Sequence, residues 1–132
     1  MTVLDTSGAV DVLLGSGASA TVNDLLARQG PLAAPDVLTF EVLAVLRRMA
    51  SRGDAGPERL GGAVADLGDL SLQLYPAMPL RARAWGLREN FTAGDALFVA
   101  LAEALDEPLA TKDLGLADAT ERHTGVRVVR LG

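Results

Sequence analysis

Four acidic residues occupy positions where an α/β fold can bring carboxylates together, namely Asp5, Glu41, Asp95 and Asp113. Asp5 and Asp113 come at or just after short apolar runs that favour β-strands. Glu41 and Asp95 fall near the starts of segments with helical periodicity. Because sites in open α/β sheets form outside the carboxyl edge of the strands, the pattern predicts that these side chains meet at one edge of a sheet.

A cluster of carboxylates indicates a divalent metal site. Two unit charges about 4 Å apart repel by roughly 4 kcal/mol at an effective dielectric of about 20, and a cation offsets that repulsion. Mg²⁺ prefers oxygen ligands and keeps several waters, so these acids suit one or two ions. Such a metal can orient and activate a water and stabilise charge on a phosphoryl oxygen, which favours phosphodiester hydrolysis. We expect the hydroxyls of Thr6, Ser7 and Thr111 to orient the acids or a water.

The same residues also have ordinary structural roles. Thr92-x-x-Asp95 has the form of a capping box, which satisfies amide groups at the start of a helix. Asp5 and Asp113 each precede an expected helix, where an acid meets the helix dipole favourably. The two hydroxyl residues after Asp5 suit capping and turn formation. Glu41 could be a solvated or paired acid, so spacing alone leaves both interpretations open.

The elements that would position the site alternate along the chain between strands and helices. The expected strands are residues 2–5, 32–34, 71–75, 109–111 and 127–131. The expected helices are a segment ending at 14, 19–29, one opened by Pro35-Asp36 and ending near 52, 57–67, one starting near Pro79, 91–105 and 115–124. This alternation predicts one α/β domain over residues 1–132, with a mostly parallel sheet of four to five short strands and helices on both faces.

The clearest helix is the segment 91–105. Leu97, Phe98, Leu101 and Leu105 recur at the spacing of one helical face, so this segment should lie against the core over most of its length. Asp95 would then stand in the first turn, at the edge of the core.

Composition restricts the chemistry further. The chain has 132 residues, enough for one domain with a sizeable core, and no cysteine, which excludes disulfides and thiolate sites. One histidine, His123, rules out multi-histidine zinc sites, and we expect it on the surface of a late helix. A net charge of −5 argues against binding nucleic acid through a broad positive surface. The first apolar run is short and contains Asp11, so we expect no membrane span and a cytoplasmic protein.

The short motifs around the four acids agree in order, spacing and secondary-structure setting. They are Asp5-Thr6-Ser7 after an apolar strand, Thr39-Phe40-Glu41-Val42, the segment from Asp95 to Glu103, and Thr111-Lys112-Asp113-x-x-Leu116. Together they resemble the motifs of PIN-domain ribonucleases, especially VapC-type toxins, over nearly the full chain.

This resemblance implies a specific activity and specific partners. Asp5, Glu41, Asp95 and Asp113 would bind the metal of an endoribonuclease that depends on Mg²⁺ or Mn²⁺. A cognate antitoxin would neutralise the toxin by blocking the acidic pocket with a basic side chain, and the protein would form a homodimer. Transfer RNA and ribosomal RNA both remain open as substrates.

Other interpretations keep the fold and change the function. A catalytically silent module that binds a protein or RNA is the main alternative. A phospho-acceptor receiver would need an acidic pair at the first strand, and an Asp-nucleophile phosphatase would need an acid where Ser7 stands. Asp118 is expected to face solvent or cap a helix. Local arginines could contact RNA or lie on solvated faces; these are Arg47, Arg48, Arg52, Arg81, Arg83 and Arg88.

Overall fold

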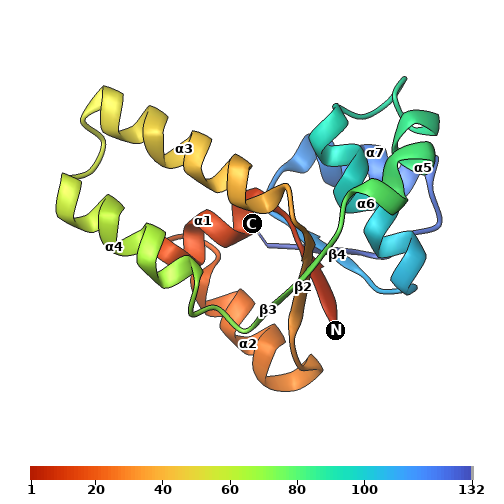
Figure 1. Ribbon diagram of the computed structural model, residues 1–132. Helices are drawn as coiled ribbons and strands as arrows, with labels where there is room; N and C mark the ends of the chain where they lie inside the picture. The colour runs from red at the N-terminus through yellow and green to blue at the C-terminus, as the bar shows by residue number, and fades with distance from the viewer. Residues whose placement is uncertain (132) are drawn as a thin grey trace.

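A five-stranded parallel sheet forms the centre of the protein (Figure 1). The computed structural model describes residues 1–131. The strands are β1 (Thr2–Leu4), β2 (Leu32–Pro35), β3 (Leu72–Tyr75), β4 (Leu109–Thr111) and β5 (Val128–Arg130). Their spatial order is β3-β2-β1-β4-β5, and every neighbouring pair is parallel. The predicted α/β class is confirmed.

Helices cover both faces of this sheet. They are α1 (Thr6–Leu14), α2 (Ser19–Gln29), α3 (Leu38–Arg52), α4 (Pro57–Leu67), the 3₁₀ turn η1 (Met78–Leu80), α5 (Arg81–Gly86), α6 (Ala93–Leu105) and α7 (Leu114–His123). Helices α1 to α4 lie on one side of the sheet and α5 to α7 on the other (Figure 1). This follows from right-handed crossovers, because the chain moves across the sheet in one direction up to β3 and in the opposite direction afterwards. Helices α3 and α4 pair into an arm that extends away from the sheet (Figure 1).

The direction of the chain through the sheet reverses between β1 and β4. From β1 the chain moves outward to β2 and β3, and it then returns to β4 and moves the other way to β5. Such a switch point leaves a crevice at the carboxyl edge, between crossovers that leave on opposite faces. Helices α1 and α7 start directly beyond the two strands that flank the switch point.

Helix α6 is buried on more than one side. Its residues from Phe98 to Ala102 are all buried, because β1 and β2 lie on one side of it and α5 packs on another. Leu97 and Leu105, predicted to share the core-facing stripe, are only half-buried. Helix α6 therefore packs in the core as predicted. Its buried face is wider than the predicted apolar stripe and is shifted relative to it.

One predicted helix start was wrong. Pro35 does not open a helix, because it pairs with Tyr75 as the last residue of β2. The amide of Asp36 then donates to the Tyr75 carbonyl at 2.8 Å, which continues the ladder and delays α3 until Leu38. The helix expected near Pro79 is present: it begins as a 3₁₀ turn and continues as a helix of only 6 residues.

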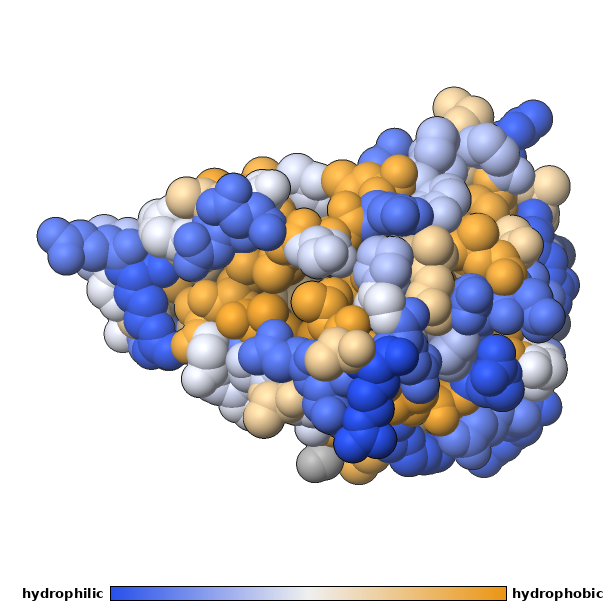
Figure 2. Space-filling view, turned by 90° about the horizontal axis from the view of Figure 1, so that it is seen from below, coloured by the Kyte–Doolittle hydropathy of each residue, from blue (hydrophilic) through white to orange (hydrophobic). Residues whose placement is uncertain are grey.

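The arm carries three of the seven exposed large hydrophobic residues of the described chain. Figure 2 shows hydrophobic residues gathered over the tapering end of the molecule, which corresponds to the arm on the left of Figure 1. Phe40 and Leu43 of α3 are 70% and 44% exposed, and Val64 of α4 is 44% exposed. Within residues 1–131, no helix combines the length and the apolar character needed to cross a bilayer.

Thr92 caps α6, as predicted, by accepting a hydrogen bond from the amide of Asp95 at 3.2 Å. We expect Thr92→Ala to lower the free energy of unfolding by about 1 kcal/mol, because an orphan amide loses its partner. Thr92→Ser keeps the acceptor and should recover most of the loss. Urea unfolding of the three proteins tests this, and equal midpoints for wild type and Thr92→Ala would contradict the capping role.

Candidate active site

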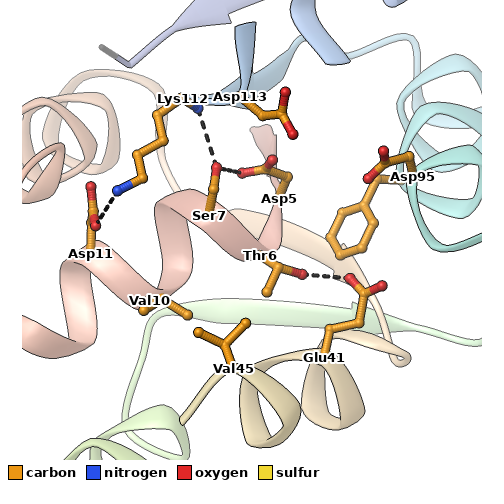
Figure 3. Close-up of a pocket in the computed structure, with 11 residues that line it drawn as sticks. Asp5, Thr6, Ser7, Val10, Asp11, Glu41, Val45, Asp95, Lys112 and Asp113 are labelled. Carbon is orange, nitrogen blue, oxygen red and sulfur yellow. Dashed lines mark hydrogen bonds and ion pairs between the residues drawn. The ribbon is translucent and has the colours of Figure 1, made fainter. Parts of the chain in front are cut away.

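A cavity of about 350 Å³ opens at the carboxyl edge of the sheet, beside the switch point. All four predicted acids line it, and Figure 3 shows their side chains around one space. The remaining lining residues are Thr6, Ser7, Val10, Asp11, Val45, Phe98 and Lys112. The structure therefore gathers residues that are far apart in sequence, from α1, α3, α6 and the start of α7, into one pocket.

Asp5 has the most hydrogen bonds of the four acids. It is 5% exposed and caps α1, with Oδ1 accepting from the Gly8 amide at 3.1 Å and from Ser7 Oγ at 2.7 Å. Its Oδ2 accepts from Thr111 Oγ1 at 2.5 Å. Burial raises the pKa of Asp5 above its ordinary value, although these three bonds oppose that shift; the charge of Asp113 adds a smaller upward contribution.

The two hydroxyls bonded to Asp5 also hold the loop after β4. Thr111 Oγ1 accepts from the amide of Asp113 at 3.0 Å, and Ser7 Oγ accepts from the amide of Lys112 at 3.3 Å. Both hydroxyls therefore donate to a carboxylate while accepting from a backbone amide. This fixes the position of Asp113 relative to Asp5, across the switch point.

Glu41 is positioned by two other elements. Its Oε1 accepts from Thr6 Oγ1 at 2.6 Å, which joins the first turn of α3 to that of α1. Its Oε2 lies against Gly94 at the start of α6, where a Cβ atom would collide with the carboxylate. The hydrogen-bond partner of Glu41 is thus the Thr6 hydroxyl, and Gly94 allows α6 to approach its carboxylate.

Asp95 and Asp113 complete the cluster. Asp95 is half-buried, and burial is the main cause that raises its pKa above the ordinary value. The charges of Asp113, Glu41 and Asp5 raise it further, while the bond with Thr92 lowers it. Asp113 caps α7, with Oδ1 accepting from the Leu116 amide at 3.0 Å. Asp113 therefore both caps α7 and belongs to the acidic cluster.

The donor set suits a hard divalent cation. The acids offer carboxylate oxygens, with hydroxyls beside them; burial chiefly, and the charges of neighbouring acids to a smaller extent, raise the pKa of Asp5 and of Asp95. Among residues 1–131, however, no three acidic or histidine side chains stand ready to hold one ion together. The arrangement fits Mg²⁺, which is commonly held by one or two carboxylates and several waters, better than it fits a closed protein cage.

Sequence reasoning missed two charged residues of the cavity. Asp11 was considered only as an interruption of an apolar run, yet it is 5% exposed and pairs with Lys112 at 2.7 Å. The signal in the sequence was an acid within a segment expected to form a buried helix.

Asp118 lies outside the cavity, exposed as predicted, and pairs with Arg130 at 2.8 Å. His123 is exposed at the end of α7, also as predicted.

Comparisons with known proteins show which family and fold the chain resembles. The sequence profile of the PIN domain matches residues 2–122. Ribonuclease VapC1 from Mycobacterium tuberculosis is 40% identical over 129 residues, which cover 97% of each protein. PAE2754 from Pyrobaculum aerophilum shares the fold with a TM-score of 0.72 at 18% identity, covering 96% of this chain and 81% of that one. A toxin-antitoxin complex from Klebsiella pneumoniae contains a chain with a TM-score of 0.64 at 18% identity, covering 100% and 98%.

The raised pKa of Asp95 has a consequence for stability in the absence of metal. The unfolded chain releases this proton at a lower pH than the folded chain does, so the penalty on folding builds up as pH rises from the ordinary pKa toward the raised pKa and is complete above it. Each unit of upward shift is worth about 1.4 kcal/mol at high pH. We expect metal-free Asp95→Asn to be at least as stable as wild type at neutral pH, with the difference closing below about pH 4.

Urea unfolding in a chelating buffer across this pH range measures the effect. Asp118→Asn, which removes an exposed acid outside the cavity, is the matched control. A drop of several kcal/mol in Asp95→Asn at neutral pH would instead mean that Asp95 serves mainly to stabilise α6.

Proposed function

The chain belongs to the PIN domain family, among its VapC-type members, and on this premise we propose that it is a metal-dependent endoribonuclease toxin. The observation that carries the proposal is the convergence of four carboxylates in one cavity at the switch point. The name of the 40% identical relative, Ribonuclease VapC1, supports RNA as the substrate.

In this proposal Asp5, Glu41, Asp95 and Asp113 would hold Mg²⁺ or Mn²⁺, one or two of them directly and the others through bound waters. When bound, the cation would activate a water and stabilise charge that develops on the phosphate. The chain's own contribution is orientation, since carboxylates that bind a metal need their direction fixed by neighbouring donors. Ser7 and Thr111 supply those donors to Asp5, and Thr6 supplies one to Glu41.

The second part of the proposal is a cognate antitoxin. Proteins of this fold occur in complexes described as toxin-antitoxin complexes, such as the one from Klebsiella pneumoniae. An antitoxin with a basic side chain would find complementary charge in the acidic cavity. The exposed Phe40 and Leu43 on the arm, close along α3 to Glu41, offer it apolar surface beside that cavity. A homodimer and a cytoplasmic location, where RNA substrates are found, are further parts of the proposal.

A catalytically silent module that binds RNA or protein remains the alternative function. It would keep the fold and the apolar arm but would not need the acids to act on a cation. Calorimetric titration with Mg²⁺ and Mn²⁺ separates the two: binding that is abolished in Asp95→Asn favours the nuclease, and absence of binding favours the silent module.

Removing one acid should abolish cleavage without unfolding the protein. We expect Asp5→Asn and Asp95→Asn each to lower metal-dependent RNA cleavage by about 100-fold or more, because the cation loses a ligand. Asp118→Asn should cleave at the wild-type rate. Cleavage of a labelled RNA with added Mg²⁺ measures this, alongside circular dichroism to verify folding, and undiminished cleavage in both cavity variants would refute the site assignment.

In cells, the proposed toxin should produce new RNA ends. Induced expression of wild type is expected to arrest growth and to generate 5′ ends at a small number of RNA positions. Expression of Asp95→Asn at the same level should do neither. Sequencing of RNA 5′ ends identifies the substrate, and an identical pattern of ends in both strains would contradict the proposal.

A further inference from the structure

We propose that Lys112, positioned by the buried carboxylate of Asp11, binds a backbone phosphate of the RNA at one end of the acidic cavity. This inference rests on the proposed nuclease function and adds a substrate-binding residue to it. Its basis is an ion pair that lines the cavity but takes no part in holding the four predicted acids.

The ion pair is asymmetric in its exposure. Lys112 Nζ donates to Asp11 Oδ1 at 2.7 Å, and the side chain of the aspartate is 7% exposed while that of the lysine is 43% exposed. Figure 3 shows the lysine side chain reaching along the cavity wall, away from Asp113 and toward Asp11. An ammonium group has three donors, and this contact uses one of them. The other two donors of the ammonium group are available to a ligand on the exposed side of the ion pair.

Contacts with the turn before α2 fix the carboxylate of Asp11, so it cannot move with the Lys112 side chain. Its Oδ2 accepts from the Ala18 amide at 2.9 Å, which ties the carboxylate to the start of α2. Gly17 packs against the same oxygen, with φ of +47° and no room for a Cβ atom. The carboxylate therefore acts as a fixed anchor, and the position of the ammonium group follows from it.

The charge pattern of the cavity gives the lysine its role. Among the described residues that line the cavity, Lys112 is the only base, and it stands next to Asp113 in sequence. An RNA strand that enters an acidic pocket brings phosphates that its carboxylates repel. A fixed ammonium group at the far end of the pocket would attract a phosphate beside the one to be cleaved, and so set the register of the strand.

A structural interpretation of the pair makes different predictions. If Asp11 and Lys112 serve only to fix the turn between α1 and α2, removing them lowers stability and leaves substrate affinity per folded molecule unchanged. If Lys112 binds phosphate and Asp11 positions it, removing the ammonium group raises KM and weakens the salt dependence of binding, because fewer counterions are displaced.

The test measures kcat and KM for a labelled single-stranded RNA at saturating Mg²⁺, over a series of salt concentrations. We expect Lys112→Gln to raise KM by about tenfold while kcat stays near wild type, because glutamine cannot donate a charged hydrogen bond to the phosphate. The slope of log KM against log salt should fall by about 0.7, the value for one phosphate on a single strand. Lys112→Arg keeps the charge and should retain most of the affinity and the slope.

Asp11→Asn probes the anchor separately. Its amide oxygen can still accept from Ala18, but the charge that holds the ammonium group is gone. We expect a rise in KM in the same direction, and no further rise when it is combined with Lys112→Gln, since both act through one phosphate contact. The control is the exposed pair Arg28 and Asp24 on α2, whose neutral variants should leave KM and the slope unchanged.

The outcomes separate this inference from the function on which it rests. If wild type does not cleave RNA with Mg²⁺, the proposed function fails. If wild type cleaves and Lys112→Gln has the same KM and salt slope, the phosphate contact is refuted while the nuclease stands. A fall in kcat with unchanged KM would also refute it. If Asp11→Asn does not fold, the comparison of Lys112→Gln with Lys112→Arg decides.

Discussion

The hydrogen bonds to Asp5 are the constraint on which the rest of the site depends. Its carboxylate accepts from Thr111 across the switch point and from Ser7 and Gly8 in its own helix. The two hydroxyls in turn hold the amides of Lys112 and Asp113. Mutually repelling acids are thus kept together by neutral donors and by the amide groups at helix starts, whose dipoles favour negative charge. No positive side chain is needed among the four acids to hold this geometry.

Much of this arrangement follows from sequence because strand ends and helix starts are local features. A short apolar run before Asp5 or Asp113 indicates a strand, and parallel strands bring their ends to one edge. The start of α3 was mispredicted because a proline suits both the end of a strand and the first turn of a helix. Tertiary pairing of Pro35 with Tyr75 decided between them.

The remainder depends on contacts that local patterns do not encode. Lys112 and Asp11 are 101 residues apart, and neither belongs to a motif that requires the other. Gly94 reads in sequence as an ordinary glycine near a helix start, and its importance arises only when Glu41 packs against it. Such residues become visible when the elements are docked, because close approach is a property of the fold and not of either segment alone.

The sequence separation between the partners of Asp5 also bears on synthesis of the protein. Thr111 lies 106 residues after Asp5, so the pair can form only once most of the polypeptide has left the ribosome. The β5 strand comes later still in the sequence and flanks β4 at the edge of the sheet. A nascent chain therefore lacks an assembled pocket until translation has passed Thr111. In the proposed ribonuclease, the four acids of the cavity would therefore come together only after Thr111 has been synthesised.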